Sequence, residues 1–296
     1  MKTKQRIAPS SFKLYGVFGF PLKHTFSPAM HQAAFDKLGI PCFYLALELD
    51  PKNFRQVMTQ KKKLLLEGFN LTVPHKQIVK PYLDSLTFEA RAIGAVNTVI
   101  RKGKLWIGEN TDAYGFLKSL EEVHWKSKGK TVLIFGAGGA SRAVIYALCR
   151  SGARRIVLLN RTVSKARALA KYFTKFFPKT RFEVRPFEKQ VIGKTLREVD
   201  IVVNTTSVGL KRADSPLVLN GDFPRAKGNR LAVDLIYNPS ETPFLRSAKR
   251  AGWKTVNGLG MLLHQGARSF ELWTGKKAPV DIMRKALHGC MSRISL

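Results

Sequence analysis

Acidic residues are scarce in this chain of 296 residues: 20 Asp and Glu stand against 51 Lys and Arg, which gives a formal net charge of +31. Such a balance attracts polyanions, so nucleic acid has to be considered as a partner. The positive residues are spread along the whole chain, however, with Lys61, Lys62 and Lys63 as the one compact cluster, and no basic stripe is interleaved with aromatic residues. We therefore predict no specific nucleic-acid site and keep a nucleic-acid-binding protein as an alternative.

Cysteine and long apolar runs are also scarce. Cys42, Cys149 and Cys290 are far apart and form no CxxC pair, so neither a zinc site nor a disulfide framework is indicated, and no metal is expected. No run reaches the roughly 18 apolar residues of a membrane span. The opening "MKTKQRIAPSSFK" has basic residues but no apolar segment behind them, which argues against a secretory signal. These absences predict a cytoplasmic protein with reduced thiols and no membrane partner.

What the sequence does contain is an alternation of apolar strands and helices. In the first half, strands are expected at residues 14–18, 42–50 and 69–73. Helices are expected at 28–38, with Ser27 as N-cap and Gly39 past the end, at 53–67 and at 113–123, and a hairpin about Lys102 and Gly103. A second alternation starts near Lys130, with strands at 131–136, 155–160, 200–205 and 231–237 and helices at 138–152, 164–176, 242–252, 258–275 and 280–287. The pattern predicts two consecutive α/β units with mostly parallel sheets.

A glycine-rich turn opens the second alternation. "VLIFGAGGASRA" puts Gly136, Gly138 and Gly139 between a strand and a helix, where backbone N–H groups at a helix N-terminus can hold a pyrophosphate. The spacing is not the full G-x-G-x-x-G, so an ordinary tight strand-to-helix turn stays open as an alternative.

The next strand ends in "LLNRTVSKA", where a dinucleotide-binding unit reads the adenosine ribose. NAD-specific sites usually carry an acidic residue there, but this chain has Asn160, Arg161 and Thr162, with Lys165 one turn later. Arg161 offers a planar fork for a 2′-phosphate, which favours NADP over NAD. A surface arginine of a basic protein is the alternative.

Two polar clusters in the first half point to chemistry. In "GFPLKHTFSPAMH", Thr25 and Ser27 lie just before and at an expected helix N-terminus, an arrangement that suits an anion or, alternatively, a simple N-cap. Lys76 follows the strand of "EGFNLTVPHK", and Asn97 and Asp112 are polar residues in apolar surroundings. If Lys76 and Asp112 meet at one hydroxyl, they can position it and move its proton; taken singly, each also fits a solvated lysine or a helix cap.

The chain resembles the shikimate dehydrogenase family along nearly its whole length. The segments that carry the resemblance occur in the family's order, and they are "GFPLKHTFSPAMH", "GFNLTVPHK", "GAVNTV", "GENTD", "GAGGASRA", "NRT", "NTTSVG", "DLIYNPSETPFL" and "GLGMLLHQGARSFELWTG". The resemblance implies reversible reduction of 3-dehydroshikimate to shikimate by NADPH, in chorismate and aromatic amino-acid biosynthesis. It also implies a substrate-binding domain at 1–112, completed by helices at 259–296, a Rossmann-like NADP-binding domain at 113–258, and a cleft between them.

The resemblance implies roles for individual residues. Lys76 and Asp112 match the catalytic pair, and other positions match contacts of the substrate (Thr25, Ser27, Thr72, Asn97, Tyr237 and Gln265) and of the cofactor (Gly136, Ala137, Gly138, Gly139, Ala140, Asn160, Arg161, Thr162, Lys165, Leu235 and Gly258).

Two positions depart from the family pattern. Thr25 stands where serine is usual, and Glu109 stands where the motif usually has aspartate. The extra methyl group of Thr25 narrows the expected carboxylate site, so a quinate/shikimate dehydrogenase with relaxed substrate or cofactor choice remains an alternative, as does a non-catalytic ligand-binding protein. We expect a monomer or homodimer.

Overall fold

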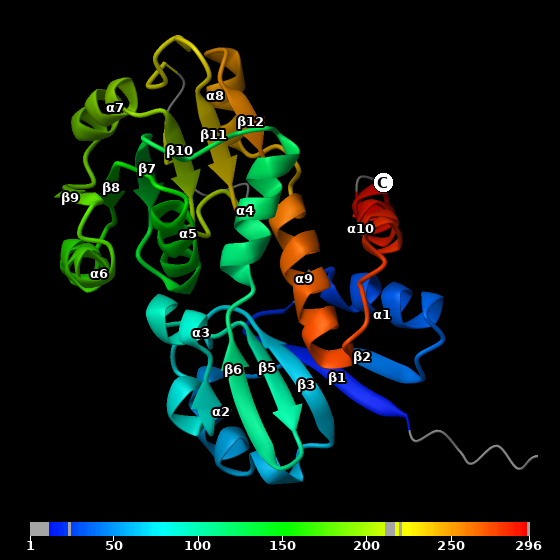
Figure 1. The fold of residues 1–296 in the computed structure, drawn as a ribbon. Helices are drawn as coiled ribbons and strands as arrows, with labels where there is room; N and C mark the ends of the chain where they lie inside the picture. Colours follow the sequence, from blue (N-terminus) through cyan, green and yellow to red (C-terminus); the bar gives the residue numbers. More distant parts are fainter. Residues whose placement is uncertain (1–11, 23–24, 211–216, 219–220, 295–296) are drawn as a thin grey trace, which may run out of the picture. The chain divides into compact units, whose positions relative to one another are not determined.

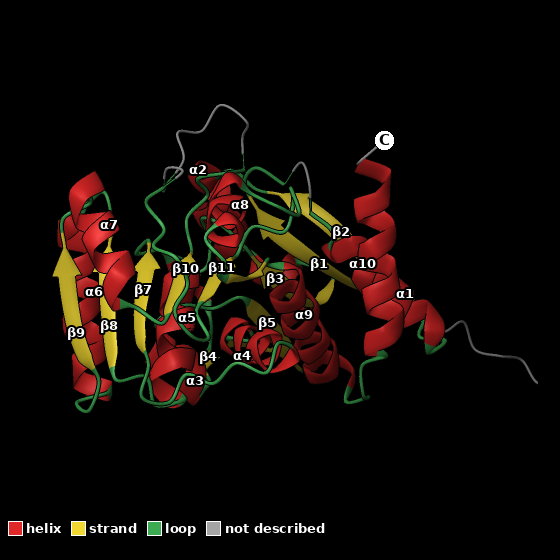
Figure 2. Ribbon diagram, turned by 90° about the horizontal axis from the view of Figure 1, so that it is seen from above, coloured by secondary structure: helices red, strands yellow, loops and turns green. Residues whose placement is uncertain are grey.

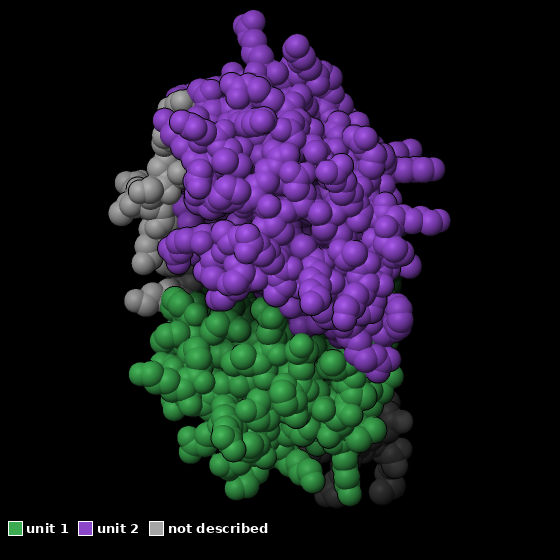
Figure 3. All heavy atoms as spheres, turned by 90° about the vertical axis from the view of Figure 1, so that its left-hand side faces the viewer, with its two compact units in different colours: residues 1–87, 96–109, 266–296 green, residues 88–95, 110–265 purple. Residues whose placement is uncertain are grey.

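The computed structural model describes residues 12–22, 25–210, 217–218 and 221–294. The chain divides into two compact units (Figures 1 and 3). Unit 1 comprises Met1–Thr87, Val96–Glu109 and Gly266–Leu296, and unit 2 comprises Phe88–Ala95 and Asn110–Gln265. Within the described residues, no helix combines the length and the apolar character needed to cross a bilayer.

Unit 1 is built on a six-stranded mixed sheet with the order β2-β1-β3-β5-β6-β4. Its strands are β1 (Lys13–Gly19), β2 (Cys42–Glu48), β3 (Leu66–Leu71), β4 (Ser85–Leu86), β5 (Thr98–Lys102) and β6 (Leu105–Glu109). β1 pairs in parallel with β2 and β3, whereas β5 runs antiparallel to both β3 and β6. The β5–β6 hairpin turns at Gly103, whose φ of 59° favours glycine, so the hairpin predicted about Lys102 and Gly103 is confirmed.

The helices of unit 1 are α1 (Ser27–Lys37), α2 (Pro51–Thr59), α10 (Val280–Ile294) and the second half of α9 (Leu259–Thr274). Aromatic side chains from three of its elements meet beneath the sheet: Tyr15 of β1 stacks on Phe35 of α1, and Phe35 packs at 5.0 Å from Phe270 of α9. α9, close to the C-terminus, therefore completes a core that the first strand begins.

The helix predicted over 53–67 was wrong at its C-terminal end. α2 ends at Thr59, a 3₁₀ turn covers Lys61–Lys63, and β3 already begins at Leu66. The Thr59 hydroxyl donates back to the carbonyls of Arg55 and Gln56, and Lys61 Nζ donates to the Tyr82 carbonyl at 2.6 Å and to Asp84 at 3.0 Å. These contacts draw the basic segment away from the helix axis.

Unit 2 has a fully parallel sheet with the order β12-β11-β10-β7-β8-β9, seen from above in Figure 2. Its strands are β7 (Thr131–Phe135), β8 (Arg155–Leu159), β9 (Arg181–Arg185), β10 (Ile201–Asn204), β11 (Leu231–Asp234) and β12 (Lys254–Val256). Its helices are α3 (Phe88–Ile93), α4 (Asp112–Glu122), α5 (Gly139–Arg150), α6 (Val163–Phe176), α7 (Lys189–Glu198), α8 (Pro243–Arg250) and the first half of α9. The sequence patterns predicted most of these elements but missed α3, β9, α7 and β12.

Both faces of the unit 2 sheet are buried, as expected for a parallel sheet. Val132 and Ile134 of β7 pack into one apolar core with α4, α5 and α6, while Leu133 and Phe135 pack into a second core with α7 and α8. The predicted two-domain α/β fold with mostly parallel sheets is confirmed.

Candidate functional site

The N-terminus of α1 carries the predicted anion-binding pair. Phe26 occupies the N-cap position without a side-chain cap, and the helix begins at Ser27, so Ser27 is not the predicted N-cap. Thr25 Oγ1 instead accepts the Ser27 N–H at 3.4 Å. Ser27 is buried and Thr25 is half-buried, and both lie in the segment that follows β1. The two hydroxyls and the positive end of the helix dipole therefore remain together.

The exit of β3 is held by backbone hydrogen bonds. Thr72 donates its N–H to the Phe18 carbonyl of β1 at 2.9 Å and accepts the His75 N–H at 2.8 Å. The Thr72 methyl lies against Gly19, where any added Cβ would collide with it. The Lys76 carbonyl accepts the Val96 N–H at 2.7 Å. This bond places Lys76 beside the segment that leads into β5.

Asn97 lies at the start of that segment and is 2% exposed. Its carbonyl accepts the Leu71 N–H at 2.8 Å, which joins it to the end of β3. Asn70, to which the sequence assigned no role, supports it. Asn70 Nδ2 donates to the Asn97 carbonyl at 3.1 Å and to Ser269 Oγ at 3.0 Å. Unit 1 thus brings Thr72, Lys76 and Asn97 together at the carboxyl end of β3.

In unit 2, Asp112 is the first residue of α4 and is 3% exposed. Asn110 accepts the Asp112 N–H at 3.1 Å through Oδ1 and donates to the Ala95 carbonyl at 2.9 Å, which fixes the helix start. One turn later α4 meets α9 at Gly115, where an added Cβ would lie 2.7 Å from the Gln265 N atom. Unit 2 therefore places Asp112 and Gln265 on facing sides of two closely packed helices.

The glycine turn joins β7 to α5. Gly136 has a φ of 110°, and an added Cβ there would lie 2.5 Å from Thr205 Oγ1, so only glycine fits. Ser141 accepts the Gly138 N–H through Oγ at 3.2 Å and contacts Thr205 Oγ1 at 2.5 Å. Gly138 is exposed and nothing lies within 4 Å of its Cβ position. The Gly136 N–H donates to the Leu159 carbonyl at 2.9 Å. The turn therefore has the N–H groups of Ala137, Gly139 and Ala140 at the helix N-terminus to offer to an anion.

The predicted 2′-phosphate segment follows β8, the neighbour of β7. Asn160 Nδ2 donates to the Thr162 carbonyl at 2.8 Å and so closes the turn before α6. Arg161 and Lys165 are exposed. In this sheet, β8 and β10 flank β7 on opposite sides. The chain order reverses there, which is where open α/β sheets bind dinucleotides.

The residues predicted at the nicotinamide end also meet. Gly258 donates its N–H to the Ile236 carbonyl at 3.0 Å, and a Cβ on Gly258 would collide with the Leu235 carbonyl oxygen. Tyr237 follows in the same segment and is half-buried. Leu235, Tyr237 and Gly258 therefore lie at one place, at the carboxyl end of β11.

A buried carboxylate at that place was missed. Asp234 ends β11, is 0% exposed, and accepts hydrogen bonds from Asn204 Nδ2 at 3.0 Å, from the Ile236 N–H at 3.1 Å and from Thr242 Oγ1 at 2.7 Å. Burial raises the pKa of Asp234 to about 6, and the three donors oppose that rise. The sequence signal was the aspartate that ends an apolar strand in "LAVDLIY".

Models of the shikimate dehydrogenase family match three segments of the chain. The shikimate dehydrogenase substrate binding domain matches residues 17–99, shikimate / quinate 5-dehydrogenase matches residues 118–242, and the shikimate 5′-dehydrogenase C-terminal domain matches residues 258–288.

Individual relatives match nearly the full length. Shikimate dehydrogenase (NADP(+)) of Desulforamulus reducens is 45% identical over 274 residues, which are 92% of this chain and 94% of the relative. Shikimate 5-dehydrogenase of Thermus thermophilus, solved in complex with NADP(H) and shikimate, has a TM-score of 0.81 at 38% identity, covering 94% of this chain and 100% of that one. Quinate dehydrogenase of Corynebacterium glutamicum, solved in complex with NAD, has a TM-score of 0.84 at 28% identity, covering 94% and 99%.

Proposed function

The chain belongs to the shikimate dehydrogenase family, and we propose that it is an oxidoreductase that reduces 3-dehydroshikimate reversibly to shikimate with NADPH, in chorismate and aromatic amino-acid biosynthesis. The observation that carries this proposal is the 45% identity, over 92% of the chain, to a relative named shikimate dehydrogenase (NADP(+)). The confirmed family membership makes the matched positions of this chain candidates for the same chemistry.

The residues of unit 2 fit an NADP cofactor. The turn Gly136–Ala140 offers N–H groups at the N-terminus of α5, at the position in the sheet where the strand order reverses. Arg161 and Lys165 are exposed cations just beyond β8, where they can bind a 2′-phosphate, with Asn160 and Thr162 shaping the turn. When bound, NADPH supplies the hydride. Leu235 and Gly258 would hold its nicotinamide end.

Within unit 1, Thr25 and Ser27 would bind the substrate carboxylate, and Thr72 and Asn97 would bind ring hydroxyls. Unit 2 would add Tyr237 and Gln265. We assign the proton transfer to Lys76, which protonates the nascent alkoxide during reduction and takes the proton back during oxidation, with Asp112 holding the same hydroxyl.

We further propose the functional boundaries expected from the sequence, with substrate binding by residues 1–112 and 259–296 and cofactor binding by residues 113–258. These differ from the two compact units, because residues 88–95, 110–112 and 259–265 belong to unit 2. We also propose that the protein is a cytoplasmic monomer or homodimer and that it acts on a small-molecule substrate.

The test is direct. We expect reduced nicotinamide to form when the purified protein is mixed with shikimate and NADP⁺ at mildly alkaline pH, and much more slowly with NAD⁺ or with quinate. Lys76→Ala should lower kcat by about 10³-fold, because it removes the group that moves the proton. Lys104→Ala, which removes an exposed lysine of the same unit, is the matched control and should leave kcat unchanged.

Two other outcomes would change the proposal. If quinate is turned over at a comparable rate, and Thr25→Ser lowers that rate, the quinate/shikimate enzyme is favoured. The similarity to the Corynebacterium quinate dehydrogenase is the reason to test it. No turnover with any pair of substrates would refute catalysis.

A further inference from the structure

The Asp234 cluster, made of Asn204, Asp234 and Thr242, joins the ends of two neighbouring strands of unit 2. Asn204 ends β10 and Asp234 ends β11, and the two residues are paired in the sheet. Thr242 is the N-cap of α8 and accepts the Leu245 N–H at 3.3 Å in addition to donating to Asp234. One carboxylate therefore contacts a strand end, a following loop and a helix start.

The loop after β10 depends on the same cluster. Asn204 Oδ1 accepts from the Thr206 N–H at 2.9 Å and the Thr206 hydroxyl at 2.7 Å, and Asn204 Nδ2 donates to the Val208 carbonyl at 3.2 Å besides donating to Asp234. The Asn204 side chain thus has all its polar contacts inside the cluster and this loop. The orientation of the Asn204 amide is fixed because the ionised Asp234 carboxylate can only accept hydrogen bonds.

The loop after β11 depends on Asp234 directly. Asp234 Oδ1 accepts the Ile236 N–H, and the Ile236 carbonyl in turn accepts the Gly258 N–H at 3.0 Å. Ile236 lies between Leu235 and Tyr237, the residues assigned to the nicotinamide end and to the substrate. The close approach of Gly258 to the Leu235 carbonyl leaves no room for a shifted loop. A change at Asp234 therefore reaches the proposed binding residues through one hydrogen bond.

Burial makes the cluster sensitive to substitution. The side chains of Asn204 and Asp234 are 0% exposed and Thr242 is 1% exposed, so water cannot replace a lost partner. The groups that contact the carboxylate are all uncharged donors, namely an amide, a hydroxyl and a backbone N–H. They hold the carboxylate in place by geometry rather than by an opposite charge.

We propose that Asp234 is a positioning residue for hydride transfer: its buried carboxylate fixes the loops after β10 and β11, and through Ile236 it holds Leu235, Tyr237 and Gly258 where nicotinamide and substrate bind. This inference rests on the proposed function. Asp234 contacts neither substrate nor cofactor in this assignment. Its role is to keep the reacting groups within the fraction of an ångström that turnover requires.

The experiment compares Asp234→Asn with Asp200→Asn. Asp200 precedes β10 at its opposite end, accepts the Thr131 N–H at 2.8 Å and pairs with Lys130 at 3.3 Å, so the control makes the same chemical change at the amino ends of the strands of the same sheet. Shikimate turnover with NADP⁺ is measured beside the affinity for adenosine 2′,5′-bisphosphate, which carries the adenine and 2′-phosphate but no nicotinamide. A second pair, Thr242→Val and Thr242→Ser, removes or keeps the hydroxyl.

We expect Asp234→Asn to lower kcat by about 30-fold and Thr242→Val by about tenfold, while affinity for adenosine 2′,5′-bisphosphate stays within about twofold. Asp200→Asn and Thr242→Ser should keep kcat within about twofold of the parent. If Asp234→Asn fails to fold, the difference in kcat between Thr242→Val and Thr242→Ser tests the inference.

If the parent is active and kcat is unchanged in a folded Asp234→Asn variant or in Thr242→Val, the positioning role of Asp234 is overturned and the proposed function stands. A loss of adenosine 2′,5′-bisphosphate affinity in parallel with kcat would also overturn it, because that result indicates a general defect of unit 2. A parent without turnover would overturn the proposed function and the inference with it.

Discussion

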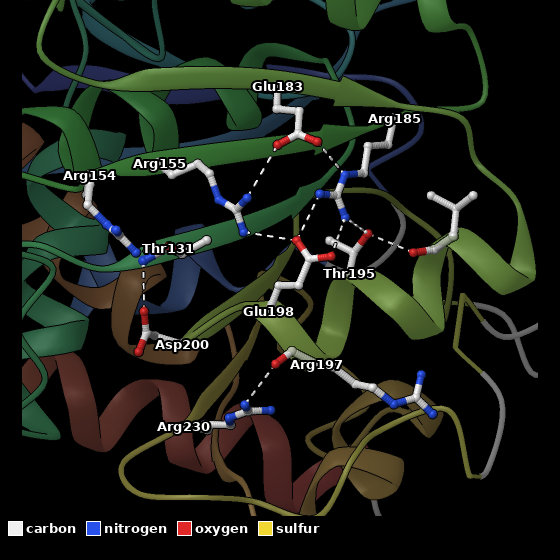
Figure 4. Close-up of polar contacts among 11 residues, drawn as sticks. Thr131, Arg154, Arg155, Glu183, Arg185, Thr195, Arg197, Glu198, Asp200 and Arg230 are labelled. Atoms are coloured by element: carbon white, nitrogen blue, oxygen red, sulfur yellow. Dashed lines mark hydrogen bonds and ion pairs between the residues drawn. The ribbon is translucent and has the colours of Figure 1, made fainter.

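Unit 2 holds two sets of carboxylates in opposite ways. In the Asp234 cluster, one fully buried carboxylate is bound by neutral donors alone. In the β8–β9 ion-pair network, made of Arg155, Glu183, Arg185 and Glu198, two partly exposed carboxylates are bound by two arginines (Figure 4). Neutral donors fix direction but do not neutralise charge, whereas arginines do both.

The two sets differ in the direction of their pKa shifts. Burial raises the pKa of Asp234 to about 6. The hydrogen bond from Arg185 is the largest cause that lowers the pKa of Glu198, and Arg155 adds to it. The first set lies at the carboxyl ends of β10 and β11, where the proposed site is. The second joins β8 and β9 to the last residue of α7. Burial therefore destabilises the charged form of Asp234 near the proposed site, whereas the arginines stabilise the charged form of Glu198 away from it.

The largest effect is expected from Asp234→Leu. The substitution leaves the Asn204 amide, the Ile236 N–H and the Thr242 hydroxyl without their shared acceptor in a buried place, so we expect the free energy of unfolding to fall by about 3 kcal/mol. Urea unfolding at neutral pH measures it, with Asp200→Leu as the control at the half-exposed end of β10. A loss no larger than that of the control would mean that the cluster is not a stabilising element of unit 2.

The pH dependence of stability should distinguish the two sets by sign. The pKa of Asp234 is higher in the folded protein than the ordinary value of 3.8. The folded state therefore takes up the proton first, and this group adds stability as the pH falls from above 6 toward 4. The full gain approaches about 3 kcal/mol. Glu198 has a lowered pKa, so its contribution is present at neutral pH and is lost as the pH falls below its ordinary value of 4.5.

Unfolding of the parent, Asp234→Asn and Glu198→Gln at pH 7, 5.5 and 4.5 separates these contributions. The stability of the parent relative to Asp234→Asn should increase steadily as the pH is lowered through this range. The stability of the parent relative to Glu198→Gln should stay nearly constant down to pH 4.5. Equal slopes for both variants would contradict the distinction between neutral donors and arginines.

A smaller effect is expected from Arg185→Met. Arg185 contacts Glu183 Oε1 at 2.7 Å, Glu198 Oε2 at 2.8 Å and Thr195 Oγ1 at 2.8 Å, and its side chain is 17% exposed. Removing it should lower the free energy of unfolding by about 1.5 kcal/mol, since two carboxylates lose a charged partner while retaining access to water and to Arg155. Arg181→Met, at the exposed start of the same strand, should change it by less than about 0.5 kcal/mol.

The contrast also explains what could be predicted from the sequence. Gly136, Lys76 and Asn97 could be named as candidates because their residue types are unusual where they stand, between apolar segments that alternate in a regular way. The two α/β units followed from the same alternation. These signals are local, and neighbouring residues suffice to recognise them.

Asp234, Asn204 and Arg185 were not found because their roles depend on partners far away in the sequence. Asn204 and Asp234 are 30 residues apart, and their pairing appears only when β10 and β11 adjoin. β9 was missed for a related reason. "RFEVR" is short and mostly charged, and it becomes a strand by pairing with β8 while Glu183 pairs with β8 and Arg185 with α7.

The smallest effect is expected from Glu198→Gln, and it tests whether the network acts as more than separate surface pairs. The Glu198 side chain is 29% exposed and shared between Arg155 at 3.1 Å and Arg185 at 2.8 Å, so it should contribute about 1 kcal/mol in low salt. Salt screens exposed charges over roughly 10 Å at 0.1 M. The contribution should therefore fall by about half in 1 M NaCl if solvent reaches the network.

Glu188→Gln removes a charge from the exposed N-terminal end of α7 and serves as the control. A Glu198 contribution that does not change with salt would show that its short hydrogen bonds to the arginines, and not long-range attraction between the charges, stabilise the fold. The two sets would then both depend on directed hydrogen bonds and would differ in the charge of the donors.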